Sequence, residues 1–260
     1  MTRRRAVFAL CLLAELAGVV LWLGVRETGV QRASHATGAV AAARTAKCSA
    51  APSPTSAGSR SLAAVARTPT VAYRRPGAGV LARFALRNQD RFPTVFAVLA
   101  VRRNAGCEPE WYRVRLPIRP NGATGWVRAR SVAIGAVDTE IVIRRGARRL
   151  ELLRAGRVVL RSRISTGAPS MPTPLGRFYV KERLIPADPN GPWGPAALGT
   201  SAYSDVLKSW VEGGPIGIHG TDDPSAIGRA VSHGCIRLPN DAMRRLYALT
   251  PAGTPIVILP

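Results

Sequence analysis

Hydrophobic and polar positions alternate in short runs along much of the chain, and a period of two is typical of half-buried β-strands. The clearest run has Tyr112, Val114 and Leu116 alternating with arginines. Asn121-Gly122 then gives a hairpin signal before a second strand at 125–127. Further strands are expected at residues 94–101, 139–143, 150–153, 158–164, 177–180 and 256–259. The pattern therefore predicts a mostly β protein.

One segment has the period of a helix. Met243, Leu246 and Tyr247 fall on one helical face within residues 240–250. Asn240 or Asp241 is the expected N-cap, and Gly253 follows as a stop signal. One main helix is expected.

The N-terminus has the pattern of an export signal. Three arginines precede residues 6–24, an apolar run whose one charged residue is Glu15. The charge asymmetry places the first residues in the cytoplasm and the rest of the chain outside it. Residues 1–26 are thus expected to be a signal anchor, with a cleaved signal peptide as the alternative. Residues 27–68, rich in small and polar residues, are expected to form a flexible linker.

The net charge of the chain indicates what kind of partner it binds. The net charge is +22, and all but three of the 37 basic residues are arginine. Such a balance favours anionic partners, namely wall polymer, a membrane surface or nucleic acid. Because the chain is expected to be exported, a nucleic-acid role is excluded, and an extracytoplasmic location held at the membrane through residues 6–24 is expected.

Two regions with different patterns follow the linker. The β-rich residues 69–135 contain a WYRV…NG…GWV pattern that resembles bacterial SH3-like domains attached to cell-wall enzymes. Residues 136–260 are expected to form a second domain. Cys48 and Cys107 could pair as a disulfide outside the cell, but sequence does not show that they approach each other.

Two of the three histidines and one of the four cysteines cluster within residues 219–235. A zinc site fits poorly, since His233 and Cys235 have only one residue between them. A thiol nucleophile fits better, with a histidine accepting its proton to give a thiolate–imidazolium pair. The N–H groups of Gly234 and Cys235 could form an oxyanion hole, and Ser232 could fix the turn. An inert buried cysteine is the alternative.

These residues resemble a known family. The motifs are Ile218-His219-Gly220-Thr221, Ser232-His233-Gly234-Cys235-Ile236-Arg237-Leu238, Ser165-Thr166-Gly167 with Thr173-Pro174-Leu175-Gly176-Arg177-Phe178, and the closing 253–258. In this order they resemble the L,D-transpeptidase catalytic domain over about 125 residues. Some members have Asn where this chain has Arg237, so a role tied to that Asn does not carry over.

The resemblance implies a β-rich catalytic domain that acts on peptidoglycan stem peptides without a cofactor or metal. It implies Cys235 as nucleophile and His219 as base, oriented by the Gly220 carbonyl. His233 has a supporting role and is the alternative base. Arg237 could bind a substrate carboxylate, and Tyr203 lies with Trp210 in a Pro- and Gly-rich segment, 183–215, that could form a lid.

The resemblance leaves two other functions open. One is an L,D-carboxypeptidase, in which water replaces the acceptor amine. The other is a non-catalytic protein that binds cell-wall polymer through the basic surface and the SH3-like domain.

Overall fold

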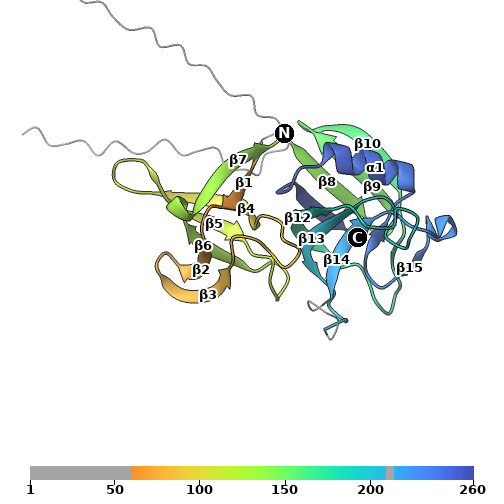
Figure 1. Cartoon of the computed structure of the whole chain (residues 1–260), viewed down its shortest axis with the longest axis horizontal. Helices are drawn as coiled ribbons and strands as arrows, with labels where there is room; N and C mark the ends of the chain where they lie inside the picture. Colours follow the sequence, from red (N-terminus) through yellow and green to blue (C-terminus); the bar gives the residue numbers. More distant parts are fainter. Residues whose placement is uncertain (1–59, 209–213) are drawn as a thin grey trace, which may run out of the picture. The chain divides into compact units, whose positions relative to one another are not determined.

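The computed structural model describes residues 60–208 and 214–260, which belong to one compact unit (Figure 1). The predicted membrane segment at residues 6–24 and the linker up to residue 59 lie outside the described residues. Within the described part, no helix is long and apolar enough to span a bilayer. The described chain is mostly strand with a single α-helix, as the alternating pattern predicts.

The first half of the described chain forms a seven-stranded sheet in the order β3-β2-β6-β5-β4-β1-β7. Alternating side chains from these strands enclose one hydrophobic core, which includes Phe96, Val114 and Val127. The predicted strand at 94–101 and the predicted hairpin after residue 111 are confirmed. The strands are β1 (Ser61–Ala66), β2 (Thr70–Arg75), β3 (Ala78–Phe84), β4 (Val95–Arg103), β5 (Pro109–Arg115), β6 (Thr124–Arg128) and β7 (Val132–Val137).

The linker prediction is wrong for its last residues, because β1 begins at Ser61 and pairs with both β4 and β7. Its small apolar residues, Ala63, Ala64 and Ala66, are buried although they show no strong periodicity. The SH3-like character of residues 69–135 remains a prediction. Cys107 is disulfide-bonded, and its predicted partner Cys48 lies outside the described residues.

The second half forms an eight-stranded sheet in the order β10-β9-β8-β17-β12-β13-β14-β16. A small parallel pair, β11 (Thr166–Gly167) with β15 (Ala230–Ser232), stands beside it. All the strands expected in this half are confirmed. The sheet consists of β8 (Thr139–Arg144), β9 (Arg149–Arg154), β10 (Arg157–Arg163), β12 (Gly176–Leu184), β13 (Ala197–Tyr203), β14 (Pro215–His219), β16 (Ile236–Arg237) and β17 (Pro255–Leu259).

The helix α1 (Asn240–Leu249) is confirmed, and it buries Met243 and Leu246 against the second sheet's core. Its expected caps are wrong. Pro239 occupies the N-cap position without a side-chain hydrogen bond, and the helix ends before Thr250 rather than at Gly253. The Asn240 side chain instead accepts a hydrogen bond from the N–H of Thr221, at 2.8 Å.

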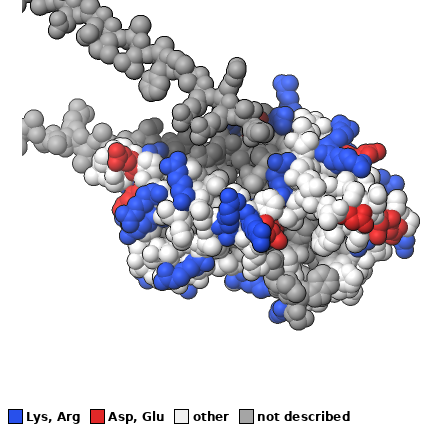
Figure 2. Space-filling model, in the orientation of Figure 1, with Lys and Arg blue, Asp and Glu red and all other residues white. Residues whose placement is uncertain are grey.

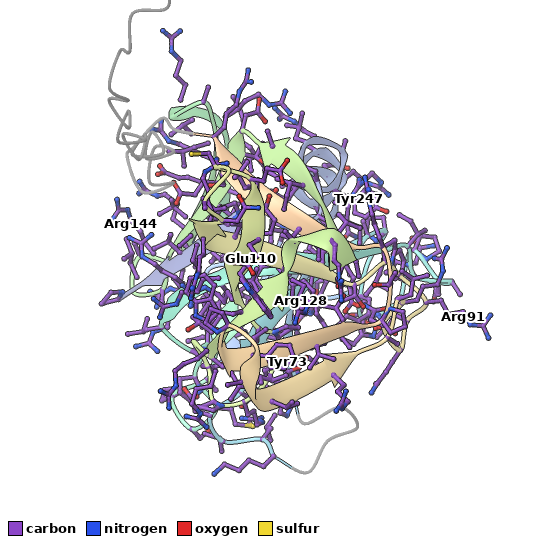
Figure 3. All side chains as sticks on the ribbon, turned by 90° about the vertical axis from the view of Figure 1, so that its left-hand side faces the viewer. Tyr73, Arg91, Glu110, Arg128, Arg144 and Tyr247 are labelled. Carbon is purple, nitrogen blue, oxygen red and sulfur yellow. The ribbon has the colours of Figure 1, made fainter. Side chains whose placement is uncertain are left out.

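Basic side chains cover much of the surface. Figure 2 shows Lys and Arg spread over the visible face, with fewer Asp and Glu among them. Arg91 and Arg144 project away from the ribbon, and both are exposed (Figure 3). The positive charge expected from the composition is therefore presented to solvent, where it is available to anionic partners.

Candidate active site

The pairing of two parallel strands brings together the two sequence motifs that contain His219 and Cys235. β14 and β16 pair with Ile218 opposite Ile236 and His219 opposite Arg237. This register places Gly217 beside Cys235, and the Gly217 N–H donates a hydrogen bond of 3.3 Å to the Cys235 Sγ. Ile218 and Ile236 point into the core. Because side chains alternate along a strand, His219 and Cys235 point to the opposite face.

The imidazole of His219 is held in one orientation by its neighbour in the chain. Its Nδ1 lies 2.7 Å from the carbonyl oxygen of Gly220. A carbonyl can only accept a hydrogen bond, so Nδ1 carries the proton and Nε2 carries the lone pair. The orienting role expected for Gly220 is thus matched by the geometry. His219 is 4% exposed, whereas His233 is exposed.

Gly217 is a neighbour of both the Cys235 thiol and the His219 imidazole. A Cβ placed on Gly217 would lie 3.8 Å from His219 Cδ2 and 3.7 Å from Trp193 Cζ3. The Trp193 ring stands over the imidazole, with ring centroids 4.6 Å apart. Trp193 is nevertheless 49% exposed. Because Gly217 has no side chain, the position beside Cys235 is not filled by one. The Trp193 ring next to this position is partly exposed to solvent.

Trp193 is not predicted from the sequence. The aromatic residues expected within segment 183–215 are Tyr203 and Trp210, and Trp210 lies outside the described residues. The available signal was an aromatic residue between glycine and proline residues, Gly191 to Pro195, in a segment expected to border the site. That signal does not state which aromatic side chain faces the histidine.

The turn that carries the nucleophile is fixed by Ser232, as predicted. The Ser232 Oγ donates to the Cys235 carbonyl at 2.6 Å and accepts the Gly234 N–H at 3.1 Å. The Gly234 N–H is thus bonded to Ser232 in the free protein, and its expected oxyanion role stays a prediction. Glycine is required there because φ is +118° and a Cβ would lie 2.8 Å from Ile216 Cδ1.

A buried threonine joins a second motif to the same turn. The Thr173 Oγ1 donates to the Gly234 carbonyl at 2.8 Å and accepts the Gly167 N–H at 2.9 Å. The parallel pair β11–β15 also places Gly167 opposite Ser232. The segments around residues 166 and 173 thus stabilise the nucleophile turn through hydrogen bonds to its backbone.

Burial sets the charge states of the thiol and the imidazole. Desolvation lowers the pKa of His219 from 6.5 to about 4, although its bond to Gly220 opposes the shift. Burial also raises the pKa of the Cys235 thiol, while the Gly217 N–H and Arg237 lower it. Both changes favour neutral groups. These shifts disfavour the expected thiolate–imidazolium pair in the free protein, and the pair stays a prediction.

The two residues expected to bind substrate lie in different places. Arg237 lies near both His219 and Cys235, since its charge lowers the pKa of each. The buried Nε of Arg237 has no hydrogen-bond partner among the described residues. Tyr203 stands at the other end of β13, where its hydroxyl donates to the Pro117 carbonyl at 2.7 Å. Within the described ranges, no group of His, Cys, Asp and Glu is arranged to hold a metal ion.

Comparison with known proteins gives a consistent match to this half of the chain. Residues 138–258 match the YkuD family model, which is described as the L,D-transpeptidase catalytic domain. The putative L,D-transpeptidase YkuD of Bacillus subtilis is 34% identical over 122 residues, which are 47% of this chain and 66% of that protein. The Bacillus licheniformis protein of the same name is 35% identical over 124 residues, covering 48% and 67%.

A solved structure is also similar in sequence to this half of the chain. The catalytic domain from an Enterococcus faecium L,D-transpeptidase is 28% identical and is matched over 97% of its length and 47% of this chain, with a TM-score of 0.35. At that TM-score the superposition carries no weight, so the assignment rests on sequence. The match spans about two thirds of each Bacillus relative.

Proposed function

Because the chain belongs to the L,D-transpeptidase catalytic domain family, we propose that it forms 3→3 cross-links between peptidoglycan stem peptides. One observation carries the proposal. Gly217 lies next to both groups: its N–H donates to the Cys235 thiol, and a Cβ placed on it would lie 3.8 Å from the His219 imidazole, which the Gly220 carbonyl holds in one tautomer. A nucleophile beside an oriented base is the arrangement that acyl transfer requires.

The first half-reaction acylates the enzyme. Substrate binding brings a peptide carbonyl to Cys235, and the thiol proton passes to Nε2 of His219 as sulfur attacks the carbonyl carbon. The C–N bond to the terminal residue then breaks, and the leaving amine takes the proton from Nε2. A thioester remains, and His219 is neutral again. The Cys235 N–H is the proposed donor to the oxyanion, since the Gly234 N–H is bonded to Ser232.

The second half-reaction returns the thiol. The side-chain amine of a second stem attacks the thioester carbon, and one of its protons passes to Nε2 of His219. The C–S bond breaks, an amide bond replaces it, and the sulfur takes the proton back. Arg237, which lies close to both groups, is proposed to bind a substrate carboxylate. His233, being exposed, is given a supporting role.

The location follows from the substrate. We propose that residues 6–24 anchor the chain in the membrane and that the enzyme works on the outer side of it. The basic surface, together with an SH3-like domain within residues 69–135, is proposed to hold the enzyme on wall polymer. These proposals rest on the charge and on the sequence pattern.

The experiment is a digest of muropeptides after incubation of the purified chain with disaccharide-tetrapeptides, read by mass spectrometry. Cross-linked 3→3 dimers are expected, and Cys235→Ala should form none. Tripeptide monomers without dimers would assign the protein as an L,D-carboxypeptidase. Wall binding without any thiol-dependent product would assign it as a non-catalytic wall-binding protein.

A further inference from the structure

The face of the sheet that carries Cys235 continues across two neighbouring strands. In β12 and β13, Glu182 pairs with Gly199. Gly199 pairs in turn with Gly217 of β14, which lies beside Cys235. Residues paired directly across strands point to the same face, with Cα atoms about 5 Å apart. Glu182, two glycines and the nucleophile therefore form one row on the face opposite the core.

The two middle positions of this row are glycines. Neither has a side chain of its own, and the Trp193 and His219 rings lie next to Gly217. A Cβ on Gly199 would collide with the Glu182 carboxylate, which shows that this carboxylate lies directly over the glycine. The row thus begins at a thiol and ends at a buried charged group.

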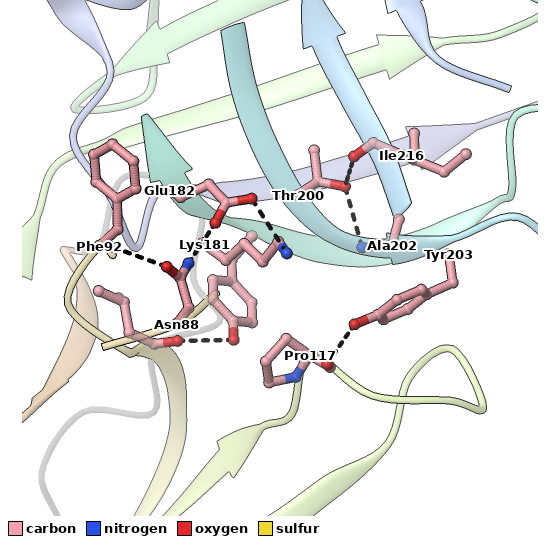
Figure 4. Close-up of polar contacts among 11 residues, drawn as sticks. Asn88, Phe92, Pro117, Lys181, Glu182, Thr200, Ala202, Tyr203 and Ile216 are labelled. Atoms are coloured by element: carbon pink, nitrogen blue, oxygen red, sulfur yellow. Dashed lines mark hydrogen bonds and ion pairs between the residues drawn. The ribbon is translucent and has the colours of Figure 1, made fainter. Parts of the chain in front are cut away.

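A register shift in β12 adds a second charge at that end. The shift lies between Val180 and Glu182, so Lys181 is an extra residue in the pairing with β13. Bulges of this kind turn a side chain to a new direction and are frequent beside active sites. The Lys181 Nζ lies 3.2 Å from the Glu182 Oε1, and the Asn88 side-chain amide donates to the Glu182 Oε2 (Figure 4). Lys181 is consequently held in place by its neighbour.

Lys181 also lines a cavity of about 380 Å³ between β12, β13 and the loop that precedes β4. Its walls carry three cationic side chains, one carboxylate and two aromatic rings. The Tyr203 ring is held by its hydroxyl bond to Pro117, drawn in Figure 4. With Glu182, which pairs with Lys181, three cations face two carboxylates. The remaining positive charge suits an anionic group attached to a partly apolar molecule. The charged and aromatic members are Arg83, Phe84, Arg87, Asp90, Lys181 and Tyr203.

We propose that this cavity is a stem-peptide subsite in which Lys181 binds a free carboxylate of the peptide joined to Cys235. The inference rests on the proposed function. β12 and β14 are two strand spacings apart, about 10 Å. Cys235 directly precedes β16, one strand further, so the thiol is about 14 Å from β12. An extended peptide covers that distance in about four residues, so the far part of a stem acylated at Cys235, rather than the acylated residue, reaches Lys181. Tyr203 then contributes to substrate binding here rather than beside the thiol.

The test removes the charge of Lys181 in the protein and, separately, the charge of each carboxylate in the peptide, and compares the effects on binding. The probes are synthetic stem tetrapeptides with free carboxylates and the same peptides with one carboxylate at a time converted to carboxamide. The proteins are the full chain, Lys181→Met, Lys181→Arg, and Lys208→Met as a control that removes an exposed lysine outside the cavity. The readouts are KM and kcat for thiol-dependent release of the terminal residue. Binding to each protein is also measured calorimetrically with Cys235→Ser added.

Lys181→Met should raise KM and the dissociation constant for the free carboxylate stem about tenfold or more, with kcat little changed. One carboxamide stem should bind the wild-type chain and Lys181→Met equally weakly, and Lys181→Arg should recover most of the loss. An equal effect on every stem, or an equal effect of Lys208→Met, would overturn the proposal. If no product forms but the binding pattern holds, the subsite stands and the proposed reaction fails.

Discussion

The Nδ1 atom of His219 lies 2.7 Å from the carbonyl oxygen of Gly220, its neighbour in the chain. The bond fixes which imidazole nitrogen can accept a proton. It also fixes where that nitrogen points, because Gly220 is itself held closely between Pro195 and Gly194. The base is therefore oriented by backbone atoms, which a side-chain substitution elsewhere does not easily move.

Replacing the two histidines separately tests which one is the base. His219→Gln should lower the acylation rate of Cys235 by about 10²–10⁴-fold, the usual contribution of a general base. His233→Gln should have a much smaller effect, because that residue is exposed and His219 is the one held at the thiol. The rate is measured by mass spectrometry of the acyl-enzyme. An equal or larger loss with His233→Gln would assign the base to His233.

The depressed pKa of His219 predicts acid sensitivity. The folded protein binds the proton near pH 4 and the unfolded chain near 6.5. The stabilising effect of the neutral imidazole is therefore complete above pH 6.5 and is lost as pH falls toward 4, by an amount on the order of 3 kcal/mol. Urea unfolding at pH 7.5 and 4.5 measures it. His219→Gln should lose less stability over this interval, and an unchanged loss would contradict the prediction.

Trp193 covers the imidazole, so its removal should let water reach His219. In Trp193→Ala the pKa of His219 should rise toward 6.5, since desolvation is the main cause of its depression. The acidic limb of the pH profile for Cys235 acylation should then move to higher pH. NMR titration of the imidazole gives the same value directly. Trp193→Phe should retain most of the depression, and a limb unchanged in Trp193→Ala would exclude the shielding role.

Thr173→Val tests the support behind the nucleophile turn. The substitution leaves the Gly167 N–H and the Gly234 carbonyl without their shared partner, which should cost about 1–3 kcal/mol of unfolding free energy. Thr200→Val is a matched control, because the Thr200 hydroxyl also bonds two backbone groups in a buried site. Both should lose stability in urea titrations, but only Thr173→Val should lower kcat strongly. If Thr173→Val and Thr200→Val had equal kcat values, the Thr173 hydroxyl would not act on catalysis through the nucleophile turn.

Gly217→Ala tests the space beside the thiol. The added methyl would make ordinary contacts with Trp193 and His219, so stability should change by no more than about 1 kcal/mol. The same methyl would stand where substrate must approach Cys235, and kcat/KM should fall at least about tenfold. Gly135→Ala is the control, since a Cβ there meets nothing within 4 Å. A variant with unchanged kcat/KM would show that substrate enters elsewhere.

The sequence predicts those strands whose side chains alternate, such as β5 and β8. β13 and β14 were not predicted, because ALGTSAY and PIGIH contain glycine and small residues that interrupt the alternation. Of these glycines, Gly217 lies beside Cys235, and Gly199 lies under the Glu182 carboxylate. The residues that weaken the strand signal are thus the ones that let other side chains lie close to the sheet on the active-site face.

The sequence motifs predict which residues form the site, but not the protonation states of the Cys235 thiol and the His219 imidazole. Cys235, His219, Gly220 and Ser232 lie together as expected, because short motifs fix local turns and a strand register. The preference of the thiol and the base for the neutral state depends on burial by residues distant in the chain, including Trp193. The engagement of the Gly234 N–H depends on a side-chain rotamer. Neither property can be derived from spacing.

One buried tyrosine links the two halves of the described chain. The Tyr179 ring on β12 is fully buried, and its hydroxyl donates to the carbonyl of Val95 on β4, at 2.9 Å. Unfolding the first sheet alone would leave this hydroxyl without its partner and expose the ring, on the same strand that carries Lys181 and Glu182. The two sheets are therefore coupled in stability, and a destabilising change in the first sheet reaches the catalytic sheet as a loss of the same cooperative unit.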